Sequence, residues 1–350
     1  MPATSRDFTA IWQQYQAIKA QQPTKYARDI ATEMAISEAE LTYARVGHDA
    51  VRLQGEMRDI LAALDVVGDT KCICRNDYAV HEQIGRFTNL HISERAGLVL
   101  NPRALDLRLF ISQWASAFYL HEQSPRGERQ SIQFFDRQGD AILKVYLTEH
   151  TDIAEWNGVI ARFTVPENPA LTLTEADGEK YAEHADGAAL DSEWRAMTDV
   201  HQFFGLLKKY NLSRQQAFRL VGDDLACLVS NDALPNLLET VQQQGNEIMI
   251  FVGNRGCVQI FTGVLEKLTP MKGWINVFNE NFTLHLRDTG IAESWVTRKP
   301  TADGHVTSLE LFAKDGTQIA QLYGQRSEGQ PEQSHWRAQI DALTNPEKAA

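Results

Sequence analysis

One histidine and two basic residues of the sequence are of types that suit the binding of a metal-containing aromatic ligand. His201 lies in the segment DSEWRAMTDVHQFF, just before a helical pattern, and a neutral imidazole is a good ligand for a transition metal. Lys299, in TRKP, and Arg326, in QLYGQR, supply cations, and Phe251 and Tyr323 supply aromatic surface. Basic groups beside an aromatic surface suit a flat apolar ligand that carries carboxylates. A metalloporphyrin is a ligand of this kind.

An internal repeat provides a comparison for each of these residues. The segment SIQFFDRQGDAILKVYL begins at Ser131, and SLELFAKDGTQIAQLYG begins at Ser308, which is an offset of 308 minus 131, or 177. The two segments share Ser, Phe, Gly and Tyr at matching places. Further matches, such as the one that sets Val46-Gly47 on Val221-Gly222, extend the repeat over nearly the whole of each half.

The candidate residues break the symmetry of this repeat. Three charges reverse between the copies: Lys299 stands opposite Glu122, Arg326 opposite Glu149, and Arg103 opposite Glu280. His201 has no imidazole opposite it in the first copy. A shared scaffold does not account for such differences, so these positions are candidate site residues. The alternative is that His201 is a packed or surface histidine and that the reversals are surface drift.

The elements that must position these residues are helices followed by strands. Ile11, Tyr15 and Ile18 have helical spacing at the start of the first copy, and the second copy opens in the same way. Alternating stretches such as SIQFF and ILKVYL follow, separated by Gly-containing turns, which predicts antiparallel hairpins. We therefore predict an α+β fold, an internal duplication of two large antiparallel β-sheet halves with flanking helices, with the helices of each copy on one side of its sheet.

Composition predicts the boundaries between the two repeats and the segment that links them. They are an N-terminal repeat at residues 1–165, an acidic linker at 166–193, and a C-terminal repeat at 194–350. The linker has many acids and little apolar content, so we expect a solvated tether.

Composition restricts the partners and the compartment. The formal net charge of −12 repels nucleic-acid phosphates and anionic lipid surfaces, so an anionic ligand must meet a local basic cluster. The first 25 residues contain no apolar run typical of a secretory signal, and no run of about 18 apolar residues predicts a membrane span. The four cysteines are too few and too scattered for a disulfide framework. We expect a cytoplasmic protein that is not embedded in a membrane.

Other motifs in the sequence give weaker indications of function. Cys72 and Cys74 point to the same side of a predicted strand, which suits a metal, but no further Cys or His pair has zinc spacing, and we expect buried thiols. The stretch from Tyr26 has the spacing of a helix-turn-helix, but acids occupy the recognition positions, so a core-packed helical hairpin is favoured. No phosphate-binding glycine loop, GxSxG or HExxH motif occurs.

The chain resembles the cytoplasmic hemin-handling proteins of the HemS/ChuS/HmuS family over essentially its full length. The resembling segments include KYARDIATEMAISEAELTYARVGHDA, NPRALDLRLFISQWASAF, SIQFFDRQGDA, DSEWRAMTDVHQFF, NEIMIFVGNRGCVQIFTG, ESWVTRKPTADG and LYGQRSEGQPEQ. The resemblance implies a duplicated fold of two large antiparallel sheets, with haem held in a cleft lined by both halves and the main haem pocket in the C-terminal repeat.

The resemblance also assigns roles to residues by position. It implies that His201 is the proximal iron ligand and that Arg103, in NPRALDL, is the distal and catalytic arginine. Lys299, Gln321, Tyr323 and Arg326 are implied around the propionates and the distal side, and Phe251 on the distal face. The chain shows no departure from the family's pattern at any of these positions.

Two classes of function follow from the resemblance and share one pocket. The first is a carrier or store that receives imported haem and delivers it. The second is an enzyme that opens the macrocycle oxidatively and releases iron. The expected partners are haem, an inner-membrane haem importer, a downstream haem acceptor and an external reductant, since no flavin or nicotinamide fingerprint is present. A DNA-binding regulator acting through the hairpin near Tyr26 is a third alternative, although no nucleic acid is expected.

Overall fold

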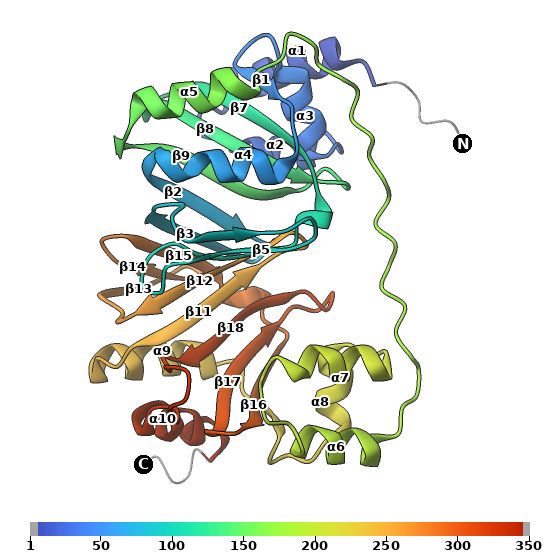
Figure 1. Ribbon diagram of the computed structural model, residues 1–350, viewed down its shortest axis with the longest axis vertical. Coiled ribbons are helices and arrows are strands. Elements are labelled where there is room, and N and C mark those ends of the chain that lie inside the picture. Colours follow the sequence, from blue (N-terminus) through green and yellow to red (C-terminus); the bar gives the residue numbers. More distant parts are fainter. Residues whose placement is uncertain (1–5, 346–350) are drawn as a thin grey trace. The chain divides into compact units, whose positions relative to one another are not determined.

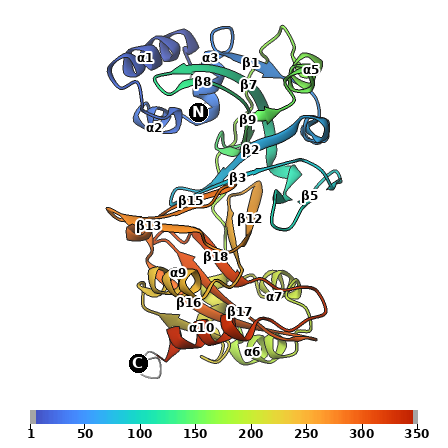
Figure 2. The ribbon, with the colours of Figure 1, turned by 90° about the vertical axis from the view of Figure 1, so that its left-hand side faces the viewer.

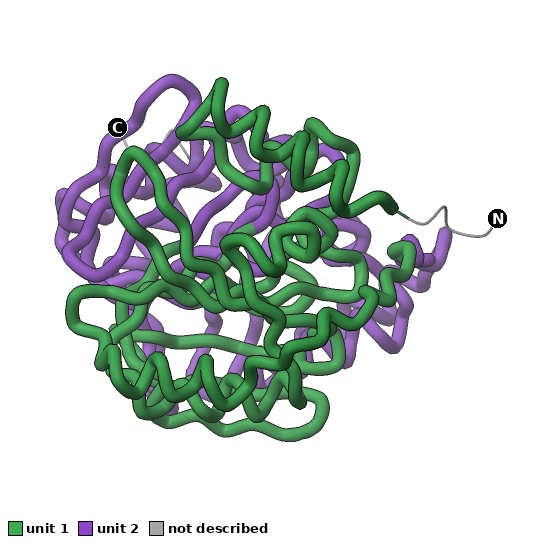
Figure 3. Tube along the Cα trace, turned by 90° about the horizontal axis from the view of Figure 1, so that it is seen from above, with its two compact units in different colours: residues 1–75, 82–176, 254–259 green, residues 76–81, 177–253, 260–350 purple. Residues whose placement is uncertain are grey.

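The computed structural model describes residues 6–345, which form two compact units that are not continuous in sequence (Figure 3). The first unit comprises the chain up to residue 75, residues 82–176 and residues 254–259. The second comprises residues 76–81, 177–253 and the chain from residue 260 on. Among the described residues, no helix is long and apolar enough to cross a membrane.

Within its described residues, the first unit contains five helices and eight complete strands, several of which are labelled in Figure 1. Its helices are α1 (Phe8–Gln21), α2 (Ala27–Glu33), α3 (Glu38–Arg45), α4 (Met57–Ala63) and α5 (Ile153–Phe163). Its strands are β1 (Ala50–Leu53), β2 (Gly68–Arg75), β4 (Leu90–Ile92), β5 (Gly97–Leu100), β6 (Asp106–Leu109), β7 (Trp114–Ser124), β8 (Gly127–Asp136) and β9 (Ala141–Thr151). Two further strands, β3 (Ala79–Gly85) and β12 (Cys257–Gly263), each run from one unit into the other.

The second unit has the same make-up. Its helices are α6 (Gly187–Arg195), α7 (Gln202–Tyr210), α8 (Arg214–Leu220), α9 (Ala233–Gln244) and α10 (Ser334–Thr344). Its strands are β10 (Ala226–Val229), β11 (Ile248–Gly253), β13 (Lys267–Met271), β14 (Trp274–Phe278), β15 (Phe282–Arg287), β16 (Glu293–Thr301), β17 (Gly304–Phe312) and β18 (Gln318–Gly324).

The strands form two nine-stranded sheets, in the orders β1-β7-β8-β9-β2-β3-β15-β14-β13 and β10-β16-β17-β18-β11-β12-β6-β5-β4. The predicted α+β duplication is therefore confirmed, and all the pairs whose register is known are antiparallel. The expectation that each copy forms a sheet of its own needs correction, because each sheet contains three strands from the other half of the sequence. The register of β6 on β12, with Leu109 opposite Cys257, belongs to this exchange.

Helices cover both faces of the strands in each unit, which corrects the expectation of helices on one side only (Figure 2). In the first unit, α4 and α5 pack on the apolar face of β7, β8 and β9, while α3 packs against Phe118 and Leu120 on the opposite face. In the second unit, α9 and α10 pack on the apolar face, and α6, α7 and α8 pack around Trp295 and Phe312 on the opposite face.

The start of one helix in each unit shows the duplication at the level of single residues. Ser37 caps α3, and its side chain and that of Glu40 exchange hydrogen bonds with the backbone of the first turn. Ser213 and Gln216 make the same capping box at the start of α8. A Ser followed three residues later by Glu or Gln satisfies two backbone donors that a helix start otherwise leaves without partners.

The acidic segment 166–193 contains no helix or strand until α6 begins at Gly187. It is not solvated throughout, however. Tyr43 donates a hydrogen bond to the carbonyl of Asn168 over 2.9 Å, Arg52 donates to that of Pro169 over 2.9 Å, and Leu171 packs against the apolar cluster around Phe118. The first part of the segment is therefore held on the first unit, and the boundaries proposed at 165 and 194 remain a prediction.

A buried histidine on β3 makes the second unit sensitive to acid. His81 has no exposed surface, and its Nε2 lies 3.3 Å from the carbonyl oxygen of Ile250. Its ring packs edge-on against Phe282, with ring centroids 4.9 Å apart. Burial disfavours the imidazolium ion and lowers the pKa of His81 from 6.5 to about 3. Between pH 6.5 and 3, His81 is therefore protonated in the unfolded chain but neutral in the folded protein.

We expect the folded protein to lose stability as the pH falls from 6.5 toward 3, and His81→Gln to reduce this loss. The glutamine does not titrate, and one proton corresponds to roughly 1.4 kcal/mol per pH unit. Urea unfolding at pH 6.5 and 4.5 should therefore show a drop in the free energy of unfolding that is about 2 kcal/mol larger for the parent than for the variant. Equal drops for the two proteins would contradict the assignment.

Candidate functional site

Most of the sequence-predicted site residues lie on the same face of the second unit's strands. Alternation along β11, β16, β17 and β18 sends apolar residues into the core with α9 and α10, and sends the intervening residues to the opposite face. One row of cross-strand neighbours on this face is Phe251, Gln321, Glu310 and Trp295. We call the face that carries this row the polar face. Helices α6, α7 and α8 partly cover it.

Phe251, Gln321 and Tyr323 are brought together on the polar face. The rings of Phe251 and Tyr323 meet edge to face, with centroids 5.2 Å apart. The Tyr323 hydroxyl donates to Oε1 of Gln321 over 2.9 Å, and Nε2 of Gln321 donates to Oε1 of Gln318 over 2.8 Å. Burial raises the pKa of Tyr323, so the hydroxyl keeps its proton and remains a donor.

Lys299 lies on the same face but deeper than the sequence suggested. The residue is only 2% exposed, and its ammonium group lies 2.9 Å from Oγ1 of Thr297 and 3.5 Å from Oε2 of Glu310. The ring of Phe203, from α7, covers the ammonium at 4.9 Å. Burial lowers the pKa of Lys299 from 10.5 to about 8, since the charged form loses its hydration.

The carboxylate beside Lys299 is the centre of a buried ion cluster. Glu310 has no exposed surface, and its Oε1 accepts hydrogen bonds from the Arg214 guanidinium and from Gln318. Burial by itself raises the pKa of a carboxyl group, but Arg214 and Lys299 outweigh it and lower the pKa of Glu310. Sequence analysis missed Glu310 and Arg214. The available signal was a charged residue between the leucines of the alternating stretch SLELF.

His201 stands at the start of α7 and points outward. Phe203 and Leu206 are the buried residues of this helix, and His201 precedes Phe203 by two residues, or about 200° of helical rotation. The His201 side chain is 87% exposed. Its backbone N–H and its ring Nδ1 both contact Oδ1 of Asp199, over 2.8 and 2.7 Å. Nε2 is thus the ring nitrogen left to bind a metal.

Arg326 lies close to the turn that carries His201. Its guanidinium is 3.7 Å from Oδ2 of Asp303, in the β16–β17 turn, and that turn is joined to the His201 turn by a hydrogen bond of 2.9 Å from the Ala302 N–H to the Thr198 carbonyl. The pKa of the Asp199 carboxyl is lowered, first by the hydrogen bonds from the backbone and ring of His201 and to a lesser degree by the charge of Arg326.

Arg103 belongs to the first unit, where it occupies the turn between β5 and β6. Its backbone φ is 68°, which is uncommon for a residue with a side chain, and the residue is exposed. The Ala104 N–H closes the turn on the carbonyl of Asn101 over 2.9 Å. A turn held in this way presents Arg103 at the surface of its unit, and the predicted position of this residue opposite His201 remains a prediction.

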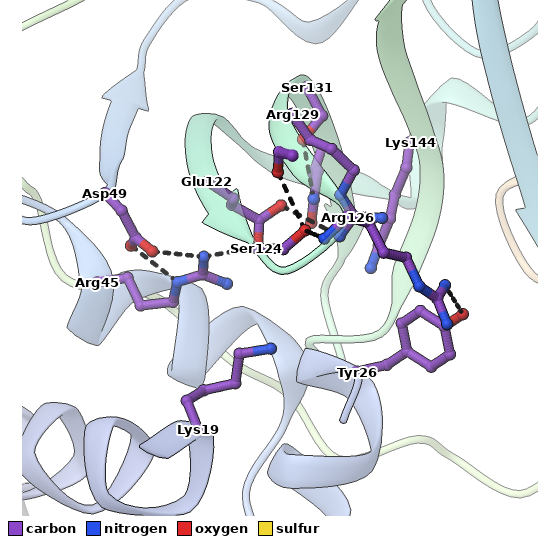
Figure 4. A network of polar contacts seen from close by, with 12 residues as sticks. Lys19, Tyr26, Arg45, Asp49, Glu122, Ser124, Arg126, Arg129, Ser131 and Lys144 are labelled. Carbon is purple, nitrogen blue, oxygen red and sulfur yellow. Dashed lines mark hydrogen bonds and ion pairs between the residues drawn. The ribbon is translucent and has the colours of Figure 1, made fainter. Parts of the chain in front are cut away.

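The equivalent face of the first unit carries a polar network in which a glutamate, Glu122, takes the place of Lys299 (Figure 4). Glu122 accepts a hydrogen bond from Arg45 over 2.8 Å and lies 3.7 Å from Arg129. Glu122 pairs with Arg129 across β7 and β8, and Lys299 holds the same place across β16 and β17. Glu122 and Lys299 are both largely buried, so surface drift does not account for this charge reversal. Glu149, opposite Arg326, is by contrast 86% exposed.

Two other motifs have structural roles. In the predicted helix-turn-helix, α3 is the would-be recognition helix, but its residues Leu41 and Arg45 are buried, so the core-packed interpretation is confirmed. Cys72 and Cys74 are also buried, and burial raises the pKa of Cys72 to about 12. No group of three or more metal-ligating side chains occurs within residues 6–345.

A shallow groove of about 210 Å³ separates α6 from α7 close to His201. Met197, Gln202, Leu206 and Lys209 are among its lining residues. Its volume is below the ~300 to 1,000 Å³ of sites that enclose a drug-sized ligand, so it does not itself accommodate a macrocycle.

Comparison with known proteins places the chain in a family. The model of the "Haemin-degrading HemS.ChuX domain" family matches residues 35–163 and again residues 211–343. The hemin transport protein HmuS of Yersinia pestis is 65% identical over 97% of this chain and 99% of its own length. HemS of Yersinia enterocolitica, also a hemin transport protein, is 63% identical over the same shares.

Solved structures extend the likeness to the fold. The heme degrading enzyme ChuS of Escherichia coli O157:H7 is 64% identical, with a TM-score of 0.93 over 96% of this chain and 99% of its own. Haem-bound PhuS, a heme-binding protein from Pseudomonas aeruginosa, is 39% identical, with a TM-score of 0.92 over 97% and 99% of the two chains. With its two matches to the family model and relatives this similar over nearly their full length, the chain belongs to the HemS/ChuS/HmuS family of hemin transport and hemin-degrading proteins.

Proposed function

We propose that this protein binds haem through His201 and handles it as cargo or substrate. The observation that carries the proposal is an exposed imidazole whose Nδ1 is held by Asp199, so that Nε2 is presented to a ligand at the start of α7. A neutral imidazole is a common axial ligand of haem iron, and one axial histidine leaves the opposite face of the iron available. Relatives described as hemin transport and heme-binding proteins support the haem-binding part of the proposal.

The polar face suits the rest of the macrocycle. Phe251 and Tyr323 offer aromatic edges and faces, and the Gln321–Tyr323 pair offers hydrogen-bonding groups without a charge. Aromatic and apolar contacts remove porphyrin surface from water, at roughly 25 cal/mol per Å² buried. These residues therefore fit a flat, largely apolar ligand, and we propose that they line its edge or its distal side.

The two candidate propionate cations differ in their accessibility. Lys299 is buried under Phe203 and pairs with Glu310, whereas the Arg326 side chain is partly exposed and lies 3.7 Å from Asp303. A guanidinium binds carboxylates in a bidentate manner, and exchange of a loose ion pair for a propionate costs little. We propose Arg326 as the propionate partner, and Lys299 as a residue that acts through the packing of α7.

What happens to the bound haem separates two activities. The protein either passes haem from an importer to an acceptor, or opens the macrocycle with electrons from an external reductant. Transport is supported by relatives described as hemin transport proteins, and degradation by the 64% identical protein described as a heme degrading enzyme. We propose haem transport as the base function and oxidative degradation as a second activity of the same site, with Arg103 on the distal side.

The first test removes the axial ligand. His201→Ala should weaken ferric haem binding by roughly tenfold or more, equivalent to at least about 1.4 kcal/mol, and should change the ferric absorption spectrum, because the nitrogen donor is lost. Spectral titration with hemin measures both effects. His335→Ala, an exposed histidine on α10, is the matched control and should behave as the parent. A parental spectrum and affinity for His201→Ala would show that the ligand assignment is wrong.

The second test concerns charge at the propionates. Arg326→Ala should weaken haem binding by about tenfold, and Arg326→Glu by about a hundredfold, since repulsion adds to the lost charged hydrogen bond. Lys299→Met should weaken binding less than either Arg326 variant, because Lys299 acts through the packing of α7 and not on the propionates. Lys314→Glu, a charge reversal at an exposed turn, should bind haem as the parent does. Titrations of the four variants check this order. Equal affinities for Arg326→Ala and Arg326→Glu would count against a propionate contact.

The third test separates turnover from binding. Arg103→Ala should still bind ferric haem, but should slow haem loss under air with a reductant by at least about tenfold, because a guanidinium on the distal side donates hydrogen bonds where oxygen chemistry develops charge. Haem absorbance is followed with peroxide scavenged, and products are identified. If the parent destroys haem no faster than free haem in the same buffer, the degradation proposal fails and transport alone is left.

A further inference from the structure

Asp199 makes two contacts with the residue proposed to bind iron. One carboxylate oxygen, Oδ1, accepts from the backbone N–H of His201 at 2.8 Å and lies 2.7 Å from its ring Nδ1. The carboxyl group is itself well exposed, so it is accessible to water as an alternative partner. Two short contacts from one oxygen to one residue define both the position of the helix start and the rotation of the imidazole ring.

These contacts determine which ring nitrogen carries the proton. An ionised carboxylate is only an acceptor, so Nδ1 must be the donor, and the lone pair of the neutral ring then lies on Nε2. Histidines that bind metals commonly donate their other ring N–H to a carboxylate or carbonyl, which orients the ring and makes the ligating nitrogen a stronger donor. The arrangement at His201 is of this kind.

The turn that carries Asp199 is held by its own hydrogen bonds. The side-chain oxygen of Gln202 accepts from the backbone N–H groups of Thr198 and Asp199, over 2.9 and 3.3 Å. The Thr198 carbonyl accepts from Ala302 at 2.9 Å, which ties the turn to the β16–β17 turn. Asp199 is therefore placed by the protein rather than by a bound ligand.

We propose that Asp199 is a positioning residue that fixes the Nδ1–H tautomer of His201 and increases its donor strength toward haem iron. The inference rests on the proposed function, in which His201 is the axial ligand. A stronger imidazole donor stabilises ferric more than ferrous iron, so Asp199 favours retention of haem in the ferric state. Asp199 thus shifts the balance of affinity toward oxidised hemin.

The haem-free protein provides the first test. Nitrogen-15 NMR of the imidazole should show His201 protonated at Nδ1 in the parent. In Asp199→Ala the Nε2–H form should predominate, as it does for histidine in water. Asp341→Asn, which removes an exposed carboxylate paired with Arg298, is the matched control and should leave the tautomer unchanged. The same Nε2–H tautomer in the parent and in Asp199→Ala would overturn the inference.

The haem-bound protein provides the second test. Asp199→Asn should weaken ferric haem binding by roughly 10- to 100-fold, the range typical for loss of an outer-shell partner, and ferrous binding by less. Each tenfold excess of ferric over ferrous loss raises the reduction potential by about 59 mV. The iron–histidine stretching frequency of the ferrous form should fall, and Asp199→Glu should restore part of both signals. An unchanged potential and frequency would overturn the inference.

The two tests distinguish this inference from the proposed function. If His201→Ala keeps the parental spectrum, axial ligation by His201 is wrong and the role of Asp199 fails with it. If His201→Ala loses the ligand signature while Asp199→Asn keeps the parental potential and frequency, haem binding through His201 stands and only the positioning role is rejected.

Discussion

The burial of one carboxylate determines how the second unit presents its candidate site. Glu310 has no exposed surface, so its charge must be met by cations inside the protein, and Arg214 and Lys299 supply them from α8 and β16. Removal of one partner of such a cluster costs about 3 to 5 kcal/mol, because a buried charge is left uncompensated. Phe203 covers both cations, with the Arg214 guanidinium and the Lys299 ammonium each 4.9 Å from its ring. The start of α7, and with it His201, is anchored by this packing.

In the first unit, the ion pair that joins the equivalent helix to its sheet has the opposite polarity. Glu38 follows the capping serine of α3 and pairs with Lys144 on β9, whereas Arg214 follows the capping serine of α8 and pairs with Glu310 on β17. An ion pair thus joins the equivalent helix to its sheet in both copies, with its polarity reversed. The duplication preserved the packing and the need for charge compensation but not the sign of each charge.

In the proposed function, transport and degradation of haem begin with the same contact. We propose axial ligation of the iron through Nε2 of His201 in either case, with the Asp199 contact at Nδ1 setting how strongly the imidazole donates. The chemistry then depends on which groups meet the other face of the iron. A hydrogen-bond donor there steers oxygen toward the macrocycle, while an apolar or empty face leaves the haem available for transfer. This is why Arg103 and Asp199 are informative positions, one for turnover and the other for the iron itself.

Sequence by itself determined the features that depend on local pattern. Alternating stretches and helical spacing are short-range patterns, and the repeat at an offset of 177 residues is visible when the two halves are aligned. The α+β duplication and the place of His201 at the start of a helix were therefore predictable. Family resemblance added roles for individual residues. Tertiary structure alone decided which charges are buried. Lys299 lies in the polar segment TRKP, yet it is 2% exposed, because α7 covers this face of the sheet. The exchange of three strands between the sheets was equally hidden, since an edge strand has the same alternation whichever sheet completes its hydrogen bonds.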